Sequence, residues 1–136
     1  MKKIRGRFAV PVVCVLLAAG MLLTPTIGRR PFRGLKASDI ASAAVRLIPP
    51  DRTVQIPETE DLAGYLNDVV IYNRDDSYTE YAGQGVFFTL TMTDGTRSEV
   101  IAFSPFLIID GAGYRTKHRP CEALNRYANQ LLDREG

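Results

Sequence analysis

The longest uncharged stretch of the chain, from Phe8 to Gly28, constrains its fold more than any other feature. It is 21 residues long and mostly apolar, and a cluster of Lys and Arg at residues 2–7 precedes it. A membrane-spanning helix needs about 20 such residues, whereas the apolar part of a cleaved signal is about 7–15 residues long. We therefore predict that residues 1–28 are an uncleaved membrane anchor or a signal peptide; a buried soluble helix is the third interpretation.

The residues of this stretch only weakly distinguish an uncleaved anchor from a cleaved signal peptide. Residues 24–28 offer only mediocre small-residue positions for cleavage, and Cys14 follows Val13 without the pattern of an acylated cysteine. The Lys and Arg cluster at the very start favours a cytoplasmic N-terminus. We expect a single-pass protein of the cell membrane with its C-terminal domain outside; secretion after signal cleavage is the alternative.

Charge divides the chain into two parts. Residues 1–36 hold eight of the 17 Lys and Arg and no carboxylate, whereas residues 37–136 hold all 15 Asp and Glu and carry a net charge of −6. The acidic part argues against nucleic acid as a partner, because that affinity comes largely from neutralising phosphates. Residues 29–37 read as a basic linker, which either rests against anionic headgroups or is neutral to topology.

Residues 38–136 are predicted to form one extracytoplasmic α+β domain. Alternating apolar residues predict strands at 43–48 and 86–93, and the continuous apolar run 106–109 predicts a buried strand. Further strands are expected at 52–56, 97–103 and 114–117, and Asp94-Gly95 is typical of a tight hairpin. One helix is expected after Pro57, with an apolar stripe from Leu62 to Val70, and another after Pro120. Behind the N-terminal hydrophobic helix, the order β-β-α-β-β-β-β-α predicts a small antiparallel sheet with helices packed on one face.

Gly64 lies inside the first of these helices. Glycine weakens a helix by about 1 kcal/mol relative to alanine. We therefore expect this glycine to mark a close approach of the helix to the sheet.

The densest run of cations in the acidic domain is the candidate site for a ligand or partner. It supplies five candidate residues: Tyr114, Arg115, Lys117, His118 and Arg119. Placed before a helix, the run could receive an anion through side chains and backbone N–H groups. The alternative is an edge strand whose exposed cations discourage aggregation.

We find no residue pattern that predicts catalysis, a metal or a cofactor. His118 is the only histidine, and Cys121 shares a helical stripe with Leu124 and Ala128, which points it inward as a small apolar side chain. The carboxylates of residues 73–85 do not match a calcium loop, so a solvated loop is expected there. The tyrosines in and around this loop are expected to pack in the core or at an edge rather than to form a contact surface.

Several segments of the domain resemble one class of bacterial proteins. These are the entry Lys36-Ala37-Ser38-Asp39-Ile40, the acidic helix with Leu62 and Leu66, the hairpin Thr93-Asp94-Gly95, and Ile108-Ile109-Asp110-Gly111 leading into Gly113-Tyr114-Arg115. Together they are similar to uncharacterised small exported or membrane-tethered domains of Gram-positive bacteria. The resemblance implies an envelope location and a non-enzymatic role, and it transfers no site residues. Such domains often carry an acylated cysteine, which this chain lacks.

The sequence thus predicts an extracytoplasmic, membrane-tethered binding or interaction domain of the bacterial cell envelope. Residues 8–28 would contact the membrane, and the domain would bind another envelope protein or an anionic ligand. Two alternatives stay open: a secreted inhibitor-like protein, and a small envelope enzyme with a site built from His118, a carboxylate and Tyr114.

Overall fold

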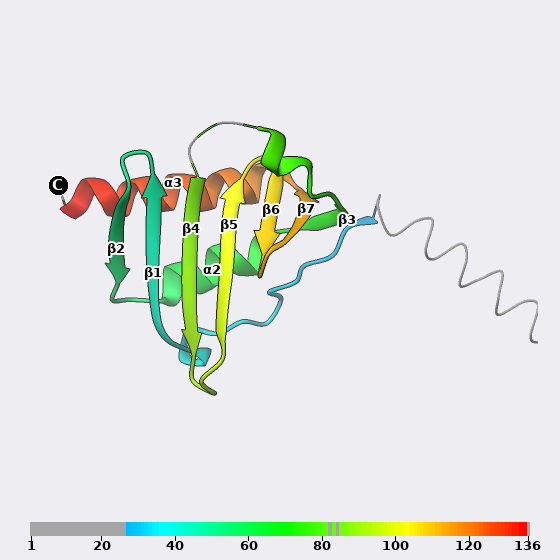
Figure 1. The fold of residues 1–136 in the computed structure, drawn as a ribbon. Helices are drawn as coiled ribbons and strands as arrows, with labels where there is room; N and C mark the ends of the chain where they lie inside the picture. The colour runs from blue at the N-terminus through cyan, green and yellow to red at the C-terminus, as the bar shows by residue number, and fades with distance from the viewer. Residues whose placement is uncertain (1–26, 82, 84, 136) are drawn as a thin grey trace, which may run out of the picture.

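The computed structural model describes residues 27–81, 83 and 85–135, which form a single antiparallel sheet and two α-helices (Figure 1). The strands are β1 (Ile40–Ile48), β2 (Arg52–Ile56), β3 (Ile71–Arg74), β4 (Gly85–Met92), β5 (Arg97–Phe103), β6 (Phe106–Ile109) and β7 (Ala112–Thr116). The α-helices are α2 (Glu60–Asp68) and α3 (His118–Glu135), and the short 3₁₀ helices are η1 (Ala37–Asp39) and η2 (Ser77–Glu80).

The predicted N-terminal hydrophobic helix lies outside the described residues. Among the residues that the structure does describe, no helix is both long and apolar enough to cross a bilayer. The membrane anchor therefore stays a prediction of the sequence.

The strands follow the order β2-β1-β4-β5-β6-β7-β3 across the sheet, and every neighbouring pair is antiparallel. The predicted α+β class is confirmed, but the predicted order of elements along the chain is one strand short, because it lacks β3. That strand is only four residues long, and its last two residues, Asn73 and Arg74, are polar and exposed. It pairs with β7, which comes about 40 residues later, so its own sequence does not predict the pairing.

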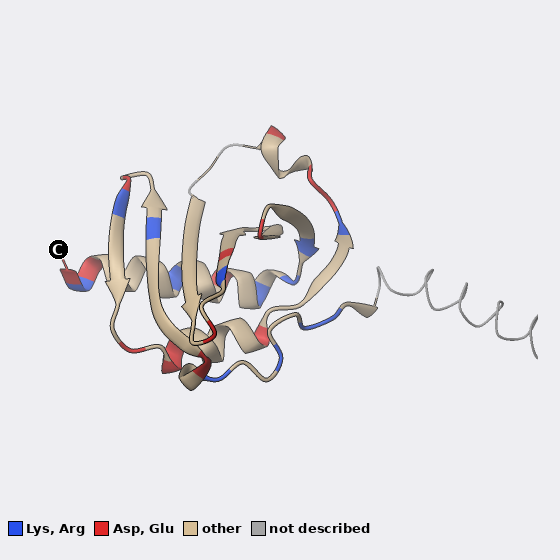
Figure 2. Cartoon of the chain, turned by 60° about the horizontal axis from the view of Figure 1, so that its bottom comes forward, with Lys and Arg blue, Asp and Glu red and all other residues tan. Residues whose placement is uncertain are grey.

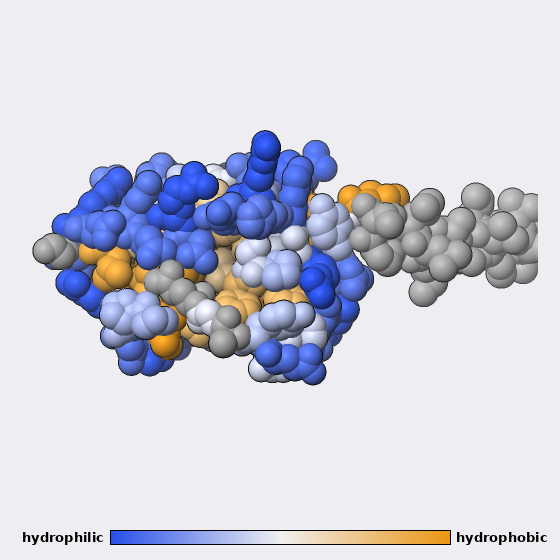
Figure 3. All heavy atoms as spheres, turned by 90° about the horizontal axis from the view of Figure 1, so that it is seen from above, coloured by the Kyte–Doolittle hydropathy of each residue, from blue (hydrophilic) through white to orange (hydrophobic). Residues whose placement is uncertain are grey.

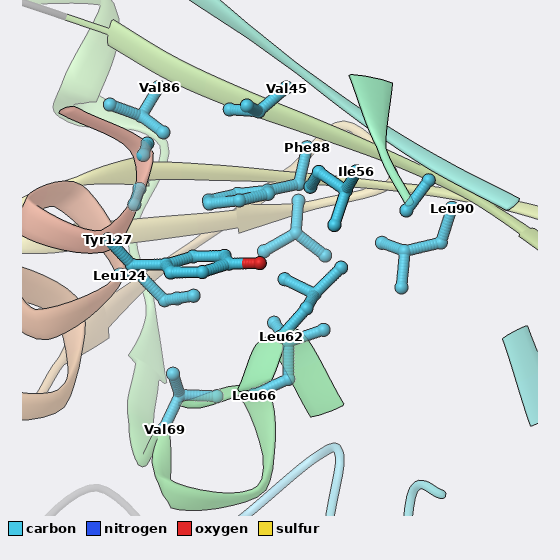
Figure 4. Packing of buried hydrophobic residues seen from close by; sticks show 14 of the residues in the cluster. Val45, Ile56, Leu62, Leu66, Val69, Val86, Phe88, Leu90, Leu124 and Tyr127 are labelled. Carbon is cyan, nitrogen blue, oxygen red and sulfur yellow. The ribbon is translucent and has the colours of Figure 1, made fainter. Parts of the chain in front are cut away.

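Both α-helices cover the same face of the sheet, as predicted (Figure 1). The core between these layers holds the side chains that alternate inward along the strands (Figure 4). Phe88 of β4 is fully buried, and its ring stacks on Tyr127 of α3 with 6.4 Å between centroids. Leu62 and Leu66 of α2 close the core from the other helix. Each such side chain contributes about 1.5–3 kcal/mol by leaving water.

Helix α2 begins where its acidic residues predicted, with Glu60 and Asp61 in the first turn. These carboxylates stabilise the positive end of the helix dipole. Gly64, however, is exposed, and a Cβ atom added there would meet nothing within 4 Å. The expected close approach of Gly64 to the sheet is therefore wrong.

The segment that was expected to be a linker packs on the domain. Arg29 exchanges two backbone hydrogen bonds with Ile71, at 2.9 and 2.8 Å, and so extends the sheet beyond β3. Further along, Phe32 and Leu35 pack against the core. The Asn67 amide of α2 fastens the segment by donating to the Leu35 carbonyl at 2.7 Å. Residues 29–36 are therefore held in place rather than free to act as a spacer.

Candidate binding site on the free sheet face

The sheet face that the helices leave free carries a row of apolar side chains. Phe87 of β4 lies opposite Ile101 of β5, and Ile101 lies opposite Ile108 of β6. Their sequence neighbours, such as Phe88, point into the core on the opposite face. The two faces follow from the two-residue period of a strand, so β4, β5 and β6 carry apolar side chains on both faces at this end of the sheet.

This row forms the floor of a pocket of about 220 Å³ at one end of the sheet. Figure 3 shows apolar side chains gathered at this end of the molecule, among hydrophilic surroundings. Tyr81 at the pocket is 55% exposed. The pocket is lined by Ile48, Tyr78, Tyr81, Gly83, Gly85, Phe87, Ile101, Phe103 and Ile108.

Residues 75–81 cross the free face and provide the tyrosine wall of the pocket. The backbone N–H of Asp75 donates to the Gly113 carbonyl at 2.9 Å, and the Gly113 N–H donates to the Asp76 carboxylate at 2.8 Å. These bonds clamp the segment onto β7. Tyr78 and Tyr81 then lie against the buried Phe106 ring, with centroid distances of 6.4 and 5.3 Å.

An ion pair stands beside this wall. Arg115 of β7 donates from Nε to the Asp75 carboxylate at 2.8 Å, and its guanidinium lies 4.7 Å from the centre of the Phe106 ring. Hydrogen bonds from the Ser77 hydroxyl and backbone, and then from Arg115, lower the pKa of Asp75 to about 2. The same carboxylate raises the pKa of Arg115. The pair is therefore fully ionised at neutral pH.

The low pKa of Asp75 gives a stability that depends on pH. An unfolded Asp has a pKa near 3.8, so the carboxylate stabilises the fold fully above about pH 4 and loses this effect as pH falls towards 2. Asp75→Asn should unfold at lower urea concentration than the parent chain at pH 6, and the gap should close between pH 4 and pH 2. Urea titrations at these pH values measure the gap; a gap that stays constant would contradict this role for Asp75.

None of the five predicted site residues lines the pocket, and only one of them lies next to it. Arg115 lies beside its tyrosine wall, whereas Tyr114 points to the other face, near the guanidinium groups of Arg29 and Arg74 at 5.7 and 5.8 Å. Lys117, which precedes α3, and Arg119 in its first turn are both exposed. The alternative that this run is an edge strand is wrong, because β7 lies between β6 and β3.

His118 has a carboxylate partner, as the enzyme alternative expected, but its other partner is Ser104 rather than Tyr114. Its Nδ1 lies 3.0 Å from the Ser104 hydroxyl, and its Nε2 lies 2.9 Å from the Glu122 carboxylate. The order serine, histidine, carboxylate resembles a nucleophile with its base, but the His118 side chain is 68% exposed and lines no part of the pocket. The residue after Ser104 is Pro105, which has no N–H to stabilise an oxyanion. The three side chains join the β5–β6 turn to α3.

Cys121 is fully buried, as its helical stripe predicted, and its thiol donates to the Phe106 carbonyl at 3.6 Å. Burial raises the pKa of this thiol to about 12, so it stays protonated and unreactive at neutral pH. Within the described part of the chain, no three His, Cys, Asp or Glu side chains are grouped as a metal site would require.

Sequence reasoning missed the pocket because it gave β4 a single apolar face, that of Phe88, Leu90 and Met92. A signal was present: Phe87 next to Phe88, and Ile101 and Phe103 around Ala102, make both faces apolar. Two apolar faces are typical of a strand that is covered on both sides.

No protein-family model matches this chain, and comparisons with curated proteins and with solved structures also give no match.

Proposed function

We propose that this chain is a membrane-tethered binding domain of the bacterial cell envelope, which receives an apolar side chain of another envelope protein in the pocket of its free sheet face. The observation that carries the proposal is the pocket itself: an aromatic and aliphatic hollow on the sheet face that the two α-helices leave free. The tether is the uncharged stretch Phe8–Gly28, and residues 38–136 are the extracytoplasmic domain.

The chemistry of the pocket and its surroundings suits a protein partner. Tyr, Phe and Arg are enriched in protein interfaces, and Tyr78, Tyr81 and Phe87 line the pocket while Arg115 stands beside the tyrosines. A pocket of about 220 Å³ has room for one large apolar side chain, which is how anchor residues of tight interfaces are held. The Arg115–Asp75 ion pair supplies a polar rim.

A photo-crosslinking amino acid in place of Tyr81 tests the proposal in native membranes. Tyr81 lines the pocket and is 55% exposed, so an aromatic probe at this position would touch an occupant and leave the helix-covered core in place. We expect irradiation to attach one recurrent envelope protein, identified by mass spectrometry. In the same background Ile101→Lys should reduce the crosslink at least tenfold, because it places a charged side chain on the pocket floor.

Thr89→Lys is the matched control for this experiment. Thr89 lies on the same sheet face and strand as Phe87 but outside the pocket, opposite Glu99, which a lysine would pair with. Thr89→Lys should therefore leave the crosslink unchanged. Equal crosslinking by the two lysine variants, or no protein above the unirradiated level, would overturn the proposal.

His118→Ala separates binding from the enzyme alternative. The His118 ring touches Ser104 and Glu122 and does not line the pocket. We expect capture of the partner to survive this substitution. Loss of capture with an intact fold would move the site to His118.

A further inference from the structure

The point where the chain leaves the domain lies directly against the sheet edge. Gly28, the last residue of the uncharged stretch, adopts a φ of +76°, and a Cβ there would meet Val70 at 2.7 Å and Tyr72 at 2.8 Å. Arg29 then pairs with Ile71 of β3. Between the end of the uncharged stretch and the folded domain there is therefore no spacer.

The helix α2 fixes the next residues of this segment. The Asn67 side chain accepts a hydrogen bond from the Gly34 N–H at 2.8 Å and donates to the Leu35 carbonyl, while Arg30 donates from Nε to the Asn67 carbonyl at 2.7 Å. These contacts keep the whole segment on the domain, so it cannot extend to lift the domain away from a bilayer.

Cations surround this exit on the surface. Arg29, Arg30 and Arg33 line one shallow hollow together with Ile27. Arg74 of β3 lies close to them, because its guanidinium and that of Arg29 are both within 6 Å of the centre of the Tyr114 ring. Figure 2 shows the basic residues of this segment and of β3 where the chain leaves the domain. We call the four arginines Arg29, Arg30, Arg33 and Arg74 the exit surface.

The exit surface has a net positive charge after its ion pairs are counted, and an exposed apolar side chain lies next to it. Among its arginines, Arg30 lies 3.7 Å from Asp68 and Arg74 lies 3.1 Å from Asp76, so four cations face two carboxylates. Ile27 beside them is 70% exposed. An exposed apolar residue among arginines is a combination that suits the boundary between headgroups and acyl chains.

We propose that the exit surface binds anionic phospholipid headgroups and holds the domain against the membrane by its β3 edge. This inference rests on the tether of the proposed function and adds the orientation of the domain. Charge complementarity and the end of the uncharged stretch at Gly28 both identify the bilayer as the occupant. The pocket lies on the sheet face rather than at this edge, so it stays open to a partner in the same membrane.

Single tryptophans can test this orientation because the chain has none of its own. Asn73→Trp places a probe on β3, and Thr53→Trp places the control probe on β2, the opposite edge of the sheet. Six strand spacings separate these edges, roughly 29 Å. The full chain is reconstituted in vesicles of phosphatidylcholine with phosphatidylglycerol and a headgroup nitroxide lipid as quencher.

We expect the probe at position 73 to be quenched at least threefold more than the probe at position 53. This difference in quenching should fall when phosphatidylglycerol is omitted. It should also fall when Arg29, Arg33 and Arg74 are all changed to Gln, because each lost arginine lowers the affinity for anionic lipid about fivefold. Changing Arg46, Arg52 and Arg97 to Gln removes the same charge elsewhere and should leave the difference intact. Equal quenching of the two probes, or equal effects of the two triple variants, would overturn the inference.

A carbonate wash of the same vesicles separates this inference from the tether. If the chain stays with the vesicles but the probes are quenched equally, the tether holds and the exit surface is wrong. If carbonate removes the chain, the tether is wrong. In that case, quenching at position 73 before the wash that needs phosphatidylglycerol and the arginines supports the exit surface without the tether. If this quenching is also absent, both the tether and the exit surface are wrong.

Discussion

Replacing Phe88 by Ala should lower the free energy of unfolding by about 3–5 kcal/mol. Phe88 is fully buried in the interior strand β4, stacks on Tyr127 of α3 and is among the largest side chains of the core. The substitution removes its apolar surface and leaves a cavity that sheet and helix can fill only in part. Urea unfolding of the chain in a non-ionic detergent, followed by circular dichroism, measures the loss.

Phe87→Ala is the matched control, one residue away on the other face of the same strand. Phe87 is half-buried and lines the pocket, so its removal leaves the helix-covered core intact. We expect a loss below about 2 kcal/mol, since partial burial gives a smaller transfer free energy. Equal losses for Phe87→Ala and Phe88→Ala would mean that the helices do not cover the face assigned to them.

Replacing Gly113 by Ala should destabilise the domain by about 1–3 kcal/mol and remove partner capture at the pocket. A Cβ at Gly113 would lie 2.5 Å from the Asp75 carbonyl oxygen and 2.8 Å from the Tyr78 ring. Because the nearest atom belongs to the backbone, the segment from Asp75 to Tyr81 would have to move. Its clamp on β7 and its tyrosine wall would then be lost together.

Gly64→Ala controls for the change of glycine to alanine itself. Space around Gly64 is open, and the residue lies inside α2, so alanine should stabilise the chain by about 0.5–1 kcal/mol. Urea unfolding gives both values, and crosslinking at position 81 gives capture. If Gly113→Ala keeps full capture, the tyrosine wall does not form the pocket as described.

The core could be predicted from the sequence because local pattern and burial agree there. Phe88 and Leu90 alternate with threonines in β4, and Cys121, Leu124 and Ala128 repeat at helical spacing in α3; all five side chains are buried. Apolar periodicity reports directly which face leaves water. The same logic failed for β3, whose four residues are too few to show a period.

The candidate site could not be predicted in this way because its parts come from distant segments. Sequence reasoning placed the site in the run Tyr114–Arg119, where Tyr114 and Arg115 were neighbours in one candidate patch. In the strand these two residues take opposite faces, so Arg115 reaches Asp75 on the free face and Tyr114 reaches Arg29 and Arg74 on the other.

The sequence alone determined the α+β class, the two helices, most strands and the buried cysteine, since periodicity and turn residues act over a few neighbouring positions. It also determined the uncharged stretch and the division of charge that predict a tether. Tertiary structure alone decided the sheet order, the docking of residues 29–36 and the pocket beneath Tyr78 and Tyr81. These depend on contacts between residues 30 to 40 positions apart, whose partners no local pattern can specify.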